Sequence, residues 1–275
     1  MTNKTFYNLP SKVKFCKKCV LSNQKPYSVP EFKHNDDKFS KHGAKYLDID
    51  ESGLCEACRY NKKKNEIDWE KREKELITLL DKHRSSDGSY DCLVPGSGGK
   101  DSMFQAHVLK YKYGMNPLTV TWPPVLYTEY GYQNFINWIE IGGFDNITFK
   151  PNGNATKLLT KLSILNLLHP FQTFILGQKN LAPKIASKYD IKLVFYGENE
   201  AEYGNPIAET VSSLRSKSYF TMKNLDEIFL AGVSIKELKE KYNLRLSELM
   251  PFLPMTAAEL EKKKTEIHYL GYYLK

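Results

Sequence analysis

The middle of the chain shows a regular succession of apolar runs and amphipathic segments. Between residues 90 and 196, short apolar runs typical of buried strands alternate with longer segments whose apolar residues recur at helical spacing. The runs predict strands over 90–95, 117–122, 146–150 and 191–196, and helices over 101–113, 130–141, 155–168 and 178–189. Such alternation indicates an α/β fold with a doubly wound, mostly parallel sheet.

The flanks of this core follow other patterns. Residues 66–84 place Trp69, Leu76 and Leu80 at helical spacing among charges, which predicts an amphipathic linking helix. From about 211 onward the chain is polar with helical spacing, and no further strand is predicted. We therefore expect three parts: 1–84, a metal-binding entry with its linking helix; 85–210, the α/β domain; and 211–275, a helical C-terminal region.

Composition narrows the class of protein. The chain has 275 residues, 41% hydrophobic and 26% charged, which excludes a disordered chain or a small disulfide scaffold. No apolar run approaches a membrane span, and no secretory signal precedes residue 20, so a cytoplasmic protein without membrane contact is expected. The net charge is +8, and residues 1–84 hold 19 Lys+Arg against 13 Asp+Glu. This basic part fits nucleic acid, an acidic partner, a phosphorylated substrate or simply a solvated surface.

Four of the five cysteines form two CxxC pairs, which are Cys16 with Cys19 and Cys55 with Cys58. Two such turns can close a tetrahedral thiolate site that suits a structural Zn²⁺ without an open position for chemistry. Two redox dithiols, or reduced cysteines without metal, are the alternatives. The segment between the pairs, from Pro30 to Ile49, is expected to bulge outward. Cys92 lies in an apolar run and is expected to be a core thiol.

A glycine-rich loop follows the first predicted strand, in Leu93-Val-Pro-Gly-Ser-Gly-Gly-Lys-Asp-Ser102. Glycines allow a tight turn that aims successive N–H groups at an anion, and the following helix N-terminus adds its dipole. The loop is therefore predicted to hold phosphate. It is not a Walker A loop, because Asp101 follows the lysine, and it is not a dinucleotide fingerprint, because Asp101 replaces its third glycine.

The sequence SGGKDS resembles the PP-loop of the ATP pyrophosphatases, which cleave ATP between the α- and β-phosphates and adenylate a substrate oxygen. The resemblance implies an adenine nucleotide α-hydrolase-like fold and ATP contacts by the loop, with Lys100 and Asp101 also catalytic. The expected ATP-binding residues are Ser97, Gly98, Gly99, Lys100, Asp101, Ser102 and, from the second strand, Thr121. Gly96 departs from the pattern, which usually has a larger apolar residue there.

The carboxyl ends of the other strands should converge on this loop. The last strand runs into Gly197-Glu-Asn-Glu-Ala-Glu-Tyr-Gly204. Three carboxylates beside a polyphosphate predict Mg²⁺ ligation or substrate contact, and an exposed acidic turn is the alternative. Glu198 and Glu200 are the expected catalytic carboxylates, with Asn199 beside them, whereas Glu202 is expected to be less involved.

The order of these features also resembles the N-acetyl sugar amidotransferases of bacterial surface-glycan synthesis (lipopolysaccharide, flagellin, pseudaminic acid). The matching segments are Ile67-Asp-Trp69, Thr119-Val-Thr-Trp122, Asn137-Trp-Ile139, Gly142-Gly-Phe-Asp145, His169-Pro-Phe-Gln172, Gly177-Gln-Lys179 and Tyr196–Gly204. The resemblance implies conversion of a sugar acetamido group to acetamidino. It also implies ammonia from a partner similar to the glutaminase of imidazole glycerol phosphate synthase. His169, Gln172, Gln178 and Lys179 are weaker candidates for sugar or nucleotide contact, with core or helix-capping roles as the alternative.

Two alternative functions and the C-terminal segment also follow from the sequence. A PP-loop tRNA-thiolating enzyme is the main alternative, although no cysteine follows Cys92 to carry sulfur. Residues 231–244 look like part of a helix-turn-helix, but 244–250 lack a basic recognition helix, so nucleic acid is not an expected partner. The chain is expected to stop inside an amphipathic helix at 270–275, as a shortened family member or a fragment would.

Overall fold

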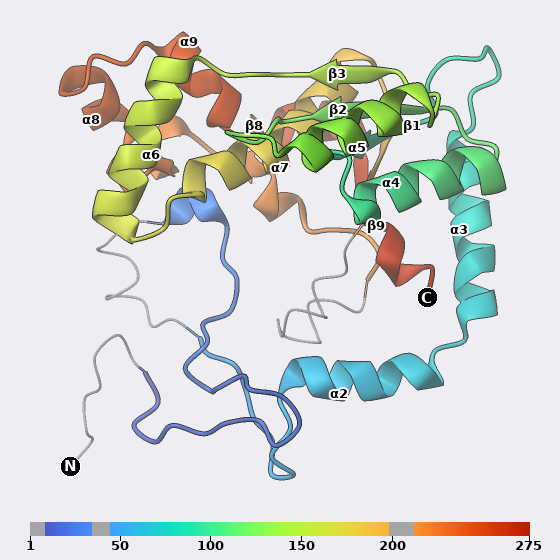
Figure 1. Cartoon of the computed structure of the whole chain (residues 1–275), viewed down its shortest axis with the longest axis horizontal. Helices are drawn as coiled ribbons and strands as arrows, with labels where there is room; N and C mark the ends of the chain where they lie inside the picture. The colour runs from blue at the N-terminus through green and yellow to red at the C-terminus, as the bar shows by residue number, and fades with distance from the viewer. Residues whose placement is uncertain (1–8, 35–44, 198–211) are drawn as a thin grey trace.

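A five-stranded parallel sheet forms the centre of the protein (Figure 1). The computed structural model describes residues 9–34, 45–197 and 212–275. The strand order is β3-β2-β1-β4-β9, and every neighbouring pair is parallel. The strands are β1 (Cys92–Pro95), β2 (Pro117–Thr121), β3 (Asn146–Thr148), β4 (Leu193–Tyr196) and β9 (Glu266–Tyr269).

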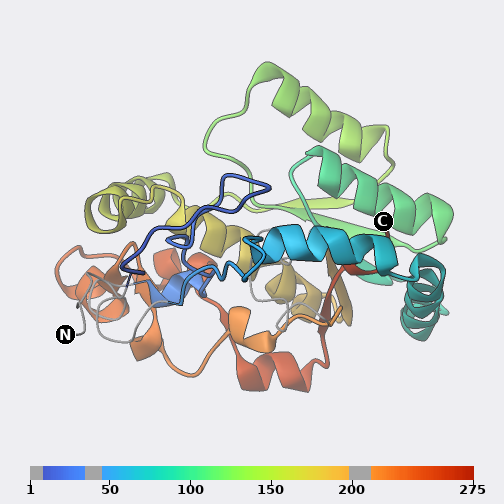
Figure 2. The same cartoon turned by 90° about the horizontal axis from the view of Figure 1, so that it is seen from below.

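Helices cover both faces of this sheet, as the alternation of apolar runs predicts. Four helices follow the first three strands: α4 (Lys100–His107) after β1, α5 (Glu129–Glu140) after β2, and α6 (Gly153–Leu167) and α7 (Gln172–Lys188) between β3 and β4. Successive residues of β1 face opposite sides: Leu93 packs with α6 and α7, whereas Cys92 and Val94 pack with α4 and α5. Figure 2 shows the same two layers from below. The doubly wound parallel fold is therefore confirmed, and Cys92 is a fully buried core thiol as expected.

The predicted elements differ from the observed ones mainly at their ends. The helix expected over 178–189 begins at Gln172, six residues earlier, and continues through Pro183. The helix expected over 101–113 is α-helical to His107 and then continues as a π-helix, Val108–Lys112. The expected linking helix is α3 (Trp69–His83), whose Leu76 and Leu80 are buried against the sheet.

The absence of strands after residue 211 is where the prediction was wrong. The fifth strand of the central sheet, β9, pairs with β4 from Leu193↔Glu266 to Tyr196↔Tyr269. Four two-residue strands also occur, namely β5 (Thr221–Met222), β6 (Phe229–Leu230), β7 (Val233–Ser234) and β8 (Met255–Thr256). Helices of this region are short: α8 (Ile235–Glu240), α9 (Leu246–Leu249) and α10 (Ala257–Lys262).

Two further expectations for the C-terminal region can be compared with the structure. Ser234 caps α8 by accepting from the Glu237 N–H (3.2 Å), but the next helix, α9, has four residues, which is no recognition helix. Leu270–Tyr272 form a 3₁₀ turn instead of the expected amphipathic helix. None of the helices in the described ranges is both long and apolar enough to cross a bilayer.

The N-terminal module, which comprises the described part of residues 1–84, lies beside the sheet and is connected to β1 by α2 (Glu56–Lys63) and α3 (Figure 1). The expectation that 30–49 simply bulges outward is wrong at its beginning. Glu31–Lys33 form a 3₁₀ turn, and Phe32 is 1% exposed within the core that α6 and α7 share. Burial of the large aromatic side chain of Phe32 lowers the free energy of the folded state, which explains why this part of a polar segment packs against the core.

Candidate functional site

The four cysteines of the CxxC pairs lie together in one cluster. Their Sγ atoms are all within 4.8 Å of one another. Cys16 Sγ lies 3.8 Å from Cys58 Sγ, and Cys19 Sγ lies 3.6 Å from Cys55 Sγ. Sulfurs bound to one tetrahedral zinc ion at roughly 2.3 Å are about 3.8 Å apart, so this donor set fits Zn²⁺. The geometry suits a closed structural site with four protein ligands.

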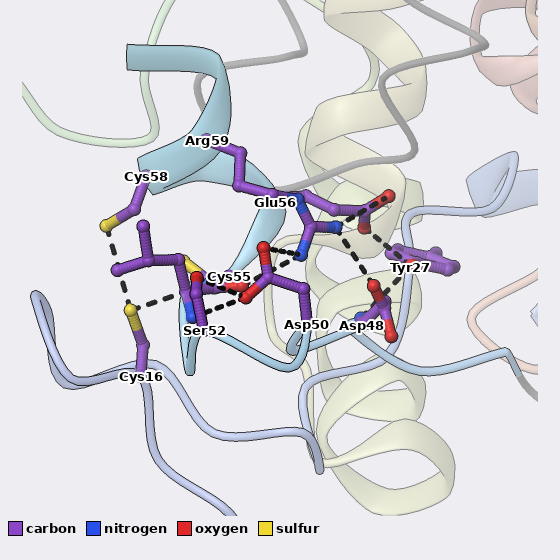
Figure 3. A network of polar contacts seen from close by, with 10 residues as sticks. Cys16, Tyr27, Asp48, Asp50, Ser52, Cys55, Glu56, Cys58 and Arg59 are labelled. Atoms are coloured by element: carbon purple, nitrogen blue, oxygen red, sulfur yellow. Dashed lines mark hydrogen bonds and ion pairs between the residues drawn. The ribbon is translucent and has the colours of Figure 1, made fainter. Parts of the chain in front are cut away.

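Local structure holds these sulfurs in place (Figure 3). Cys55 is the N-cap of α2 and Cys58 lies in its first turn, while Cys16 sits in a turn closed by its N–H to the Leu21 carbonyl (2.8 Å). The N–H groups of Cys55 and Lys18 each donate to Cys16 Sγ at 3.4 Å. Burial raises the pKa of the Cys16 thiol, but these N–H donors outweigh it and lower the pKa to about 6. Cys16 is thus prepared as a thiolate.

A polar network surrounds the cysteine cluster and ties its loops to α2 (Figure 3). The Arg59 guanidinium lies 3.0 Å from the Asp48 carboxylate and 3.4 Å from that of Asp50. Tyr27 donates to Glu56 (2.5 Å), and its hydroxyl accepts from the Asp48 N–H (3.2 Å). These bonds connect the segment before the second CxxC pair with the segment after the first. The network orients the ligands as outer partners of metal sites commonly do.

The glycine loop connects β1 to α4 at the carboxyl edge of the sheet. Gly98 has φ +81°, and a Cβ there would lie 2.5 Å from Phe135 Cα, so only glycine lets the loop approach the backbone of α5. A Cβ on Gly96 would lie 2.4 Å from Ser102 Cβ and 2.6 Å from the Trp138 ring. Trp138 and Ser102 therefore occupy the space that a larger residue would take. Gly99 is the N-cap of α4 and its carbonyl accepts from Ser102 Oγ (2.9 Å).

A cavity of about 440 Å³ opens beside this loop. Its lining includes four of the predicted loop residues: Ser97, Gly99, Asp101 and Ser102. The remaining lining residues come from the other strand ends, α4, α7 and the N-terminal module: Ser28, Pro95, Gly96, Gln105, Val120, Trp122, Ile175, Gln178, Lys179, Leu181, Tyr196, Gly197, Arg215 and Tyr269. The arrangement matches the position expected for ligands in open α/β sheets.

Three of the seven predicted ATP-binding residues do not line the cavity. Gly98 turns the loop, and Lys100 is exposed at the first position of α4. Thr121 is fully buried, and its Oγ1 accepts from Asn146 Nδ2 (3.0 Å). Thr121 thus connects β2 to β3 in this structure.

The acidic segment after β4 starts next to the loop. A Cβ built on Gly197 would lie 3.7 Å from Asp101 Cβ, so the chain leaves β4 beside the first turn of α4. Glu198, Asn199, Glu200 and Glu202 lie outside the described residues. Their roles as metal or substrate ligands stay predictions.

The weaker candidates separate into two groups. Gln178 and Lys179 line the cavity. Gln172 is fully buried and acts in packing: its side chain donates to the Glu31 and Phe229 carbonyls (2.7 and 3.1 Å) and accepts from the Ala231 N–H (2.8 Å). His169 is partly exposed outside the lining, and its carbonyl accepts from the Gln172 N–H at the start of α7 (3.4 Å).

Several lining residues were missed by the sequence analysis. Tyr269 reaches the cavity as the last residue of β9. Arg215 reaches it because residues 213–215 run along the outer edge of β9, with the Arg215 N–H donating to the Ile267 carbonyl (2.8 Å). Tyr196 lies at the end of β4, and that position was the available signal for it. Ser28 comes from the N-terminal module, and no local pattern places it there.

Comparisons with known proteins give limited likenesses. No family model matches the chain. An uncharacterised protein of Methanocaldococcus jannaschii is 40% identical over 52 residues, which are 19% of this chain and 19% of that protein. The chain thus matches about a fifth of this relative's length.

Two solved structures are similar to the chain. One is an NH3-dependent NAD synthetase from Campylobacter jejuni in complex with the nitrate ion, with 14% identity and a TM-score of 0.39, covering 72% of this chain and 93% of that one. The other is an NMN synthetase from Francisella tularensis, with 16% identity and a TM-score of 0.36, covering 72% and 85%. At these identities and TM-scores the likenesses establish no shared activity.

Proposed function

We propose that the chain is an ATP-dependent C–N ligase of the PP-loop type, which converts the acetamido group of a sugar to an acetamidino group. The observation that carries the proposal is the SGGKDS loop at the carboxyl edge of a parallel sheet, where Ser97, Asp101 and Ser102 line the cavity. The loop turns at a position that only glycine can occupy and is followed by a helix N-terminus, and this arrangement supports binding of the ATP phosphates. The structural Zn²⁺ would hold only the N-terminal module.

The chemistry balances in two steps. The acetamido oxygen attacks the α-phosphorus of ATP, the α–β bridge bond breaks, and pyrophosphate leaves. Ammonia then adds to the activated carbon, and AMP leaves with the former amide oxygen. Lys100 would neutralise phosphate charge, and Asp101 with Glu198 and Glu200 would hold Mg²⁺ or the substrate.

The proposal includes a glutaminase partner that supplies ammonia. Glutaminases of the kind proposed need a reactive cysteine, and the five cysteines of this chain are committed elsewhere. Four form the metal cluster, and Cys92 is 0% exposed, with a pKa that burial raises. The same distribution argues against the tRNA-thiolation alternative in its sulfur-relay form, since no cysteine is placed to carry sulfur into the cavity.

The test is the identity of the ATP products. With an acetamido sugar and ammonium, the wild-type protein should release AMP and pyrophosphate, and mass spectrometry of the sugar should show exchange of oxygen for NH. Lys100→Ala and Asp101→Ala should each lower this release at least about 100-fold, because the first loses the charge that neutralises phosphate and the second loses a proposed ligand of Mg²⁺ or the substrate. Release of ADP and phosphate instead would contradict the proposal.

A further inference from the structure

Two basic side chains outside the glycine loop line the same cavity. Lys179 projects from α7, and Arg215 precedes β9 along the strand edge. Both approach one aromatic ring: the Arg215 guanidinium lies 5.1 Å and Lys179 Nζ lies 5.8 Å from the centroid of Tyr219. Two cations from distant parts of the sequence therefore converge on one wall.

Aromatic rings fix the position of Arg215. Its guanidinium also lies 4.5 Å from the centroid of Tyr269 and 5.3 Å from that of Phe220. Its backbone is bonded to Ile267 of β9, so the side chain leaves from a regular position on the sheet edge. A planar guanidinium held against rings keeps its orientation and loses little entropy when it binds a planar or tetrahedral oxyanion.

Lys179 is fixed from the opposite direction by the N-terminal module. Its Nζ donates to both carboxylate oxygens of Glu31 (2.7 and 2.8 Å), with side chains only 20% and 14% exposed. Glu31 is itself anchored by the burial of Phe32 next to it. Burial lowers the pKa of Lys179, Glu31 raises it, and the charge of Arg215 lowers it again. An anion beside these two side chains would favour the charged form of Lys179, which burial and the charge of Arg215 disfavour.

We propose that Lys179 and Arg215 form a subsite for an oxyanion, a carboxylate or phosphate, carried by the acceptor sugar and distinct from the loop that takes ATP. The identity of the acceptor rests on the proposed function above, whereas the anion subsite itself does not. Gln178 lines the same cavity and offers hydrogen bonds to the rest of this ligand. Glu31 is a positioning residue that holds Lys179. The subsite selects charged acetamido sugars over neutral ones.

Binding without turnover tests this subsite on the full chain. Isothermal titration would use N-acetylneuraminic acid for a carboxylate, UDP-N-acetylglucosamine for a diphosphate, N-acetylglucosamine as the neutral sugar and α,β-methylene-ATP for the loop. At least one anionic sugar should bind about 10-fold or more tightly than the neutral one. Arg215→Met should lower the affinity for that sugar about 10- to 100-fold, which is the usual effect of losing a charge-assisted hydrogen bond. The affinity for the ATP analogue should change less than about 2-fold.

Control variants keep the result interpretable. Lys241→Met removes an exposed charge from the surface beyond α8 and should change neither affinity. If Arg215→Met does not fold by circular dichroism, the double variant Glu31→Gln with Lys179→Gln replaces it, since it keeps a hydrogen-bonded pair without the charges. The subsite proposal would be wrong if neutral and anionic sugars bound equally or if neither anionic sugar bound. It would also be wrong if Arg215→Met lowered the affinity for the ATP analogue as much as the affinity for the anionic sugar. Anionic-sugar binding without AMP release would leave the subsite standing and overturn only the proposed function.

Discussion

At the scale of single residues, the glycine loop depends on one backbone position more than on its other glycines. Gly98 combines a positive φ with backbone contact from α5. By contrast, an added Cβ at Gly153, the first residue of α6, would meet nothing within 4 Å. Comparing alanine substitutions at these two positions therefore distinguishes a position that requires glycine from the general effect of a glycine-to-alanine change.

Gly98→Ala should lower the free energy of unfolding by about 2 kcal/mol or more, because left-handed backbone costs an L-residue about 1–2 kcal/mol and the Cβ also meets Phe135. The variant should also bind the ATP analogue more weakly. Urea unfolding and isothermal titration measure the two effects. Gly153→Ala should stay within about 0.5 kcal/mol of the wild type. Equal stability of both variants would contradict the prediction that residue 98 has no space for a Cβ.

At the scale of elements, β9 brings a compact polar cluster into the interface with α3. His83 Nε2 and His268 Nε2 lie 3.5 and 3.4 Å from the Glu266 carboxylate, and His268 Nδ1 lies 3.0 Å from the Tyr273 hydroxyl. Burial lowers the pKa of both histidines, although Glu266 opposes it. The two imidazoles are therefore neutral in the folded protein at pH 7.

This cluster predicts loss of stability in mild acid. Because the folded-state pKa values of both histidines lie below the unfolded value of about 6.5, the unfolded chain binds more protons as the pH falls through 6.5, at up to about 1.4 kcal/mol per pH unit for each histidine. Glu266, whose folded pKa is lowered, adds a loss at still lower pH. The free energy of unfolding between pH 7 and 5 measures this loss. His83→Gln with His268→Gln should flatten the profile, and the exposed His107→Gln should not; an unchanged double-variant profile would refute the assignment.

The same strand shows what sequence patterns can and cannot predict. Strands β1, β2 and β4 are buried almost throughout, since both faces of the sheet are covered there, and the apolar runs predicted them together with the edge strand β3. In β9, Glu266 and His268 alternate with apolar residues, so the sequence predicts a polar amphipathic segment, whereas parallel pairing with β4 makes it a strand. The cysteine cluster was predictable because CxxC spacing is local. Arg215 was not, because it reaches the cavity only through its pairing with β9.

At the scale of the whole molecule, the N-terminal module has little core of its own. Its buried cluster consists of Cys16, Leu47, Cys55 and Cys58, with smaller contacts from six neighbours. The chain runs from the module through α2 and α3 to β1, and Phe32 packs into the core beside α6 and α7. A module so small is expected to need its metal in order to fold.

The purified protein should contain about one zinc per chain. Cys55→Ser should lose the metal and unfold or aggregate, because one ligand fewer opens the site and exposes the module's small core. Metal analysis measures the loss of zinc, and the rate of proteolytic cleavage on the N-terminal side of residue 69 measures the unfolding of the module. Cys92→Ala, whose thiol lies in the sheet away from the cluster, should keep the zinc. A metal-free protein with an intact, protease-resistant module would exclude the structural role.

The parallel pairing of β9 with β4 sets the order in which the protein can be completed during synthesis. Residues 197–265 must leave the ribosome before the edge of β4 meets its partner. Closing a loop of that length costs about 4 kcal/mol of chain entropy. During this interval β4 presents an open edge, and the cavity wall formed by Arg215 and Tyr269 does not exist. The nascent chain therefore acquires its glycine loop early and its complete cavity last. The intermediate has an exposed strand edge that is prone to aggregation, and chaperones would be expected to protect it.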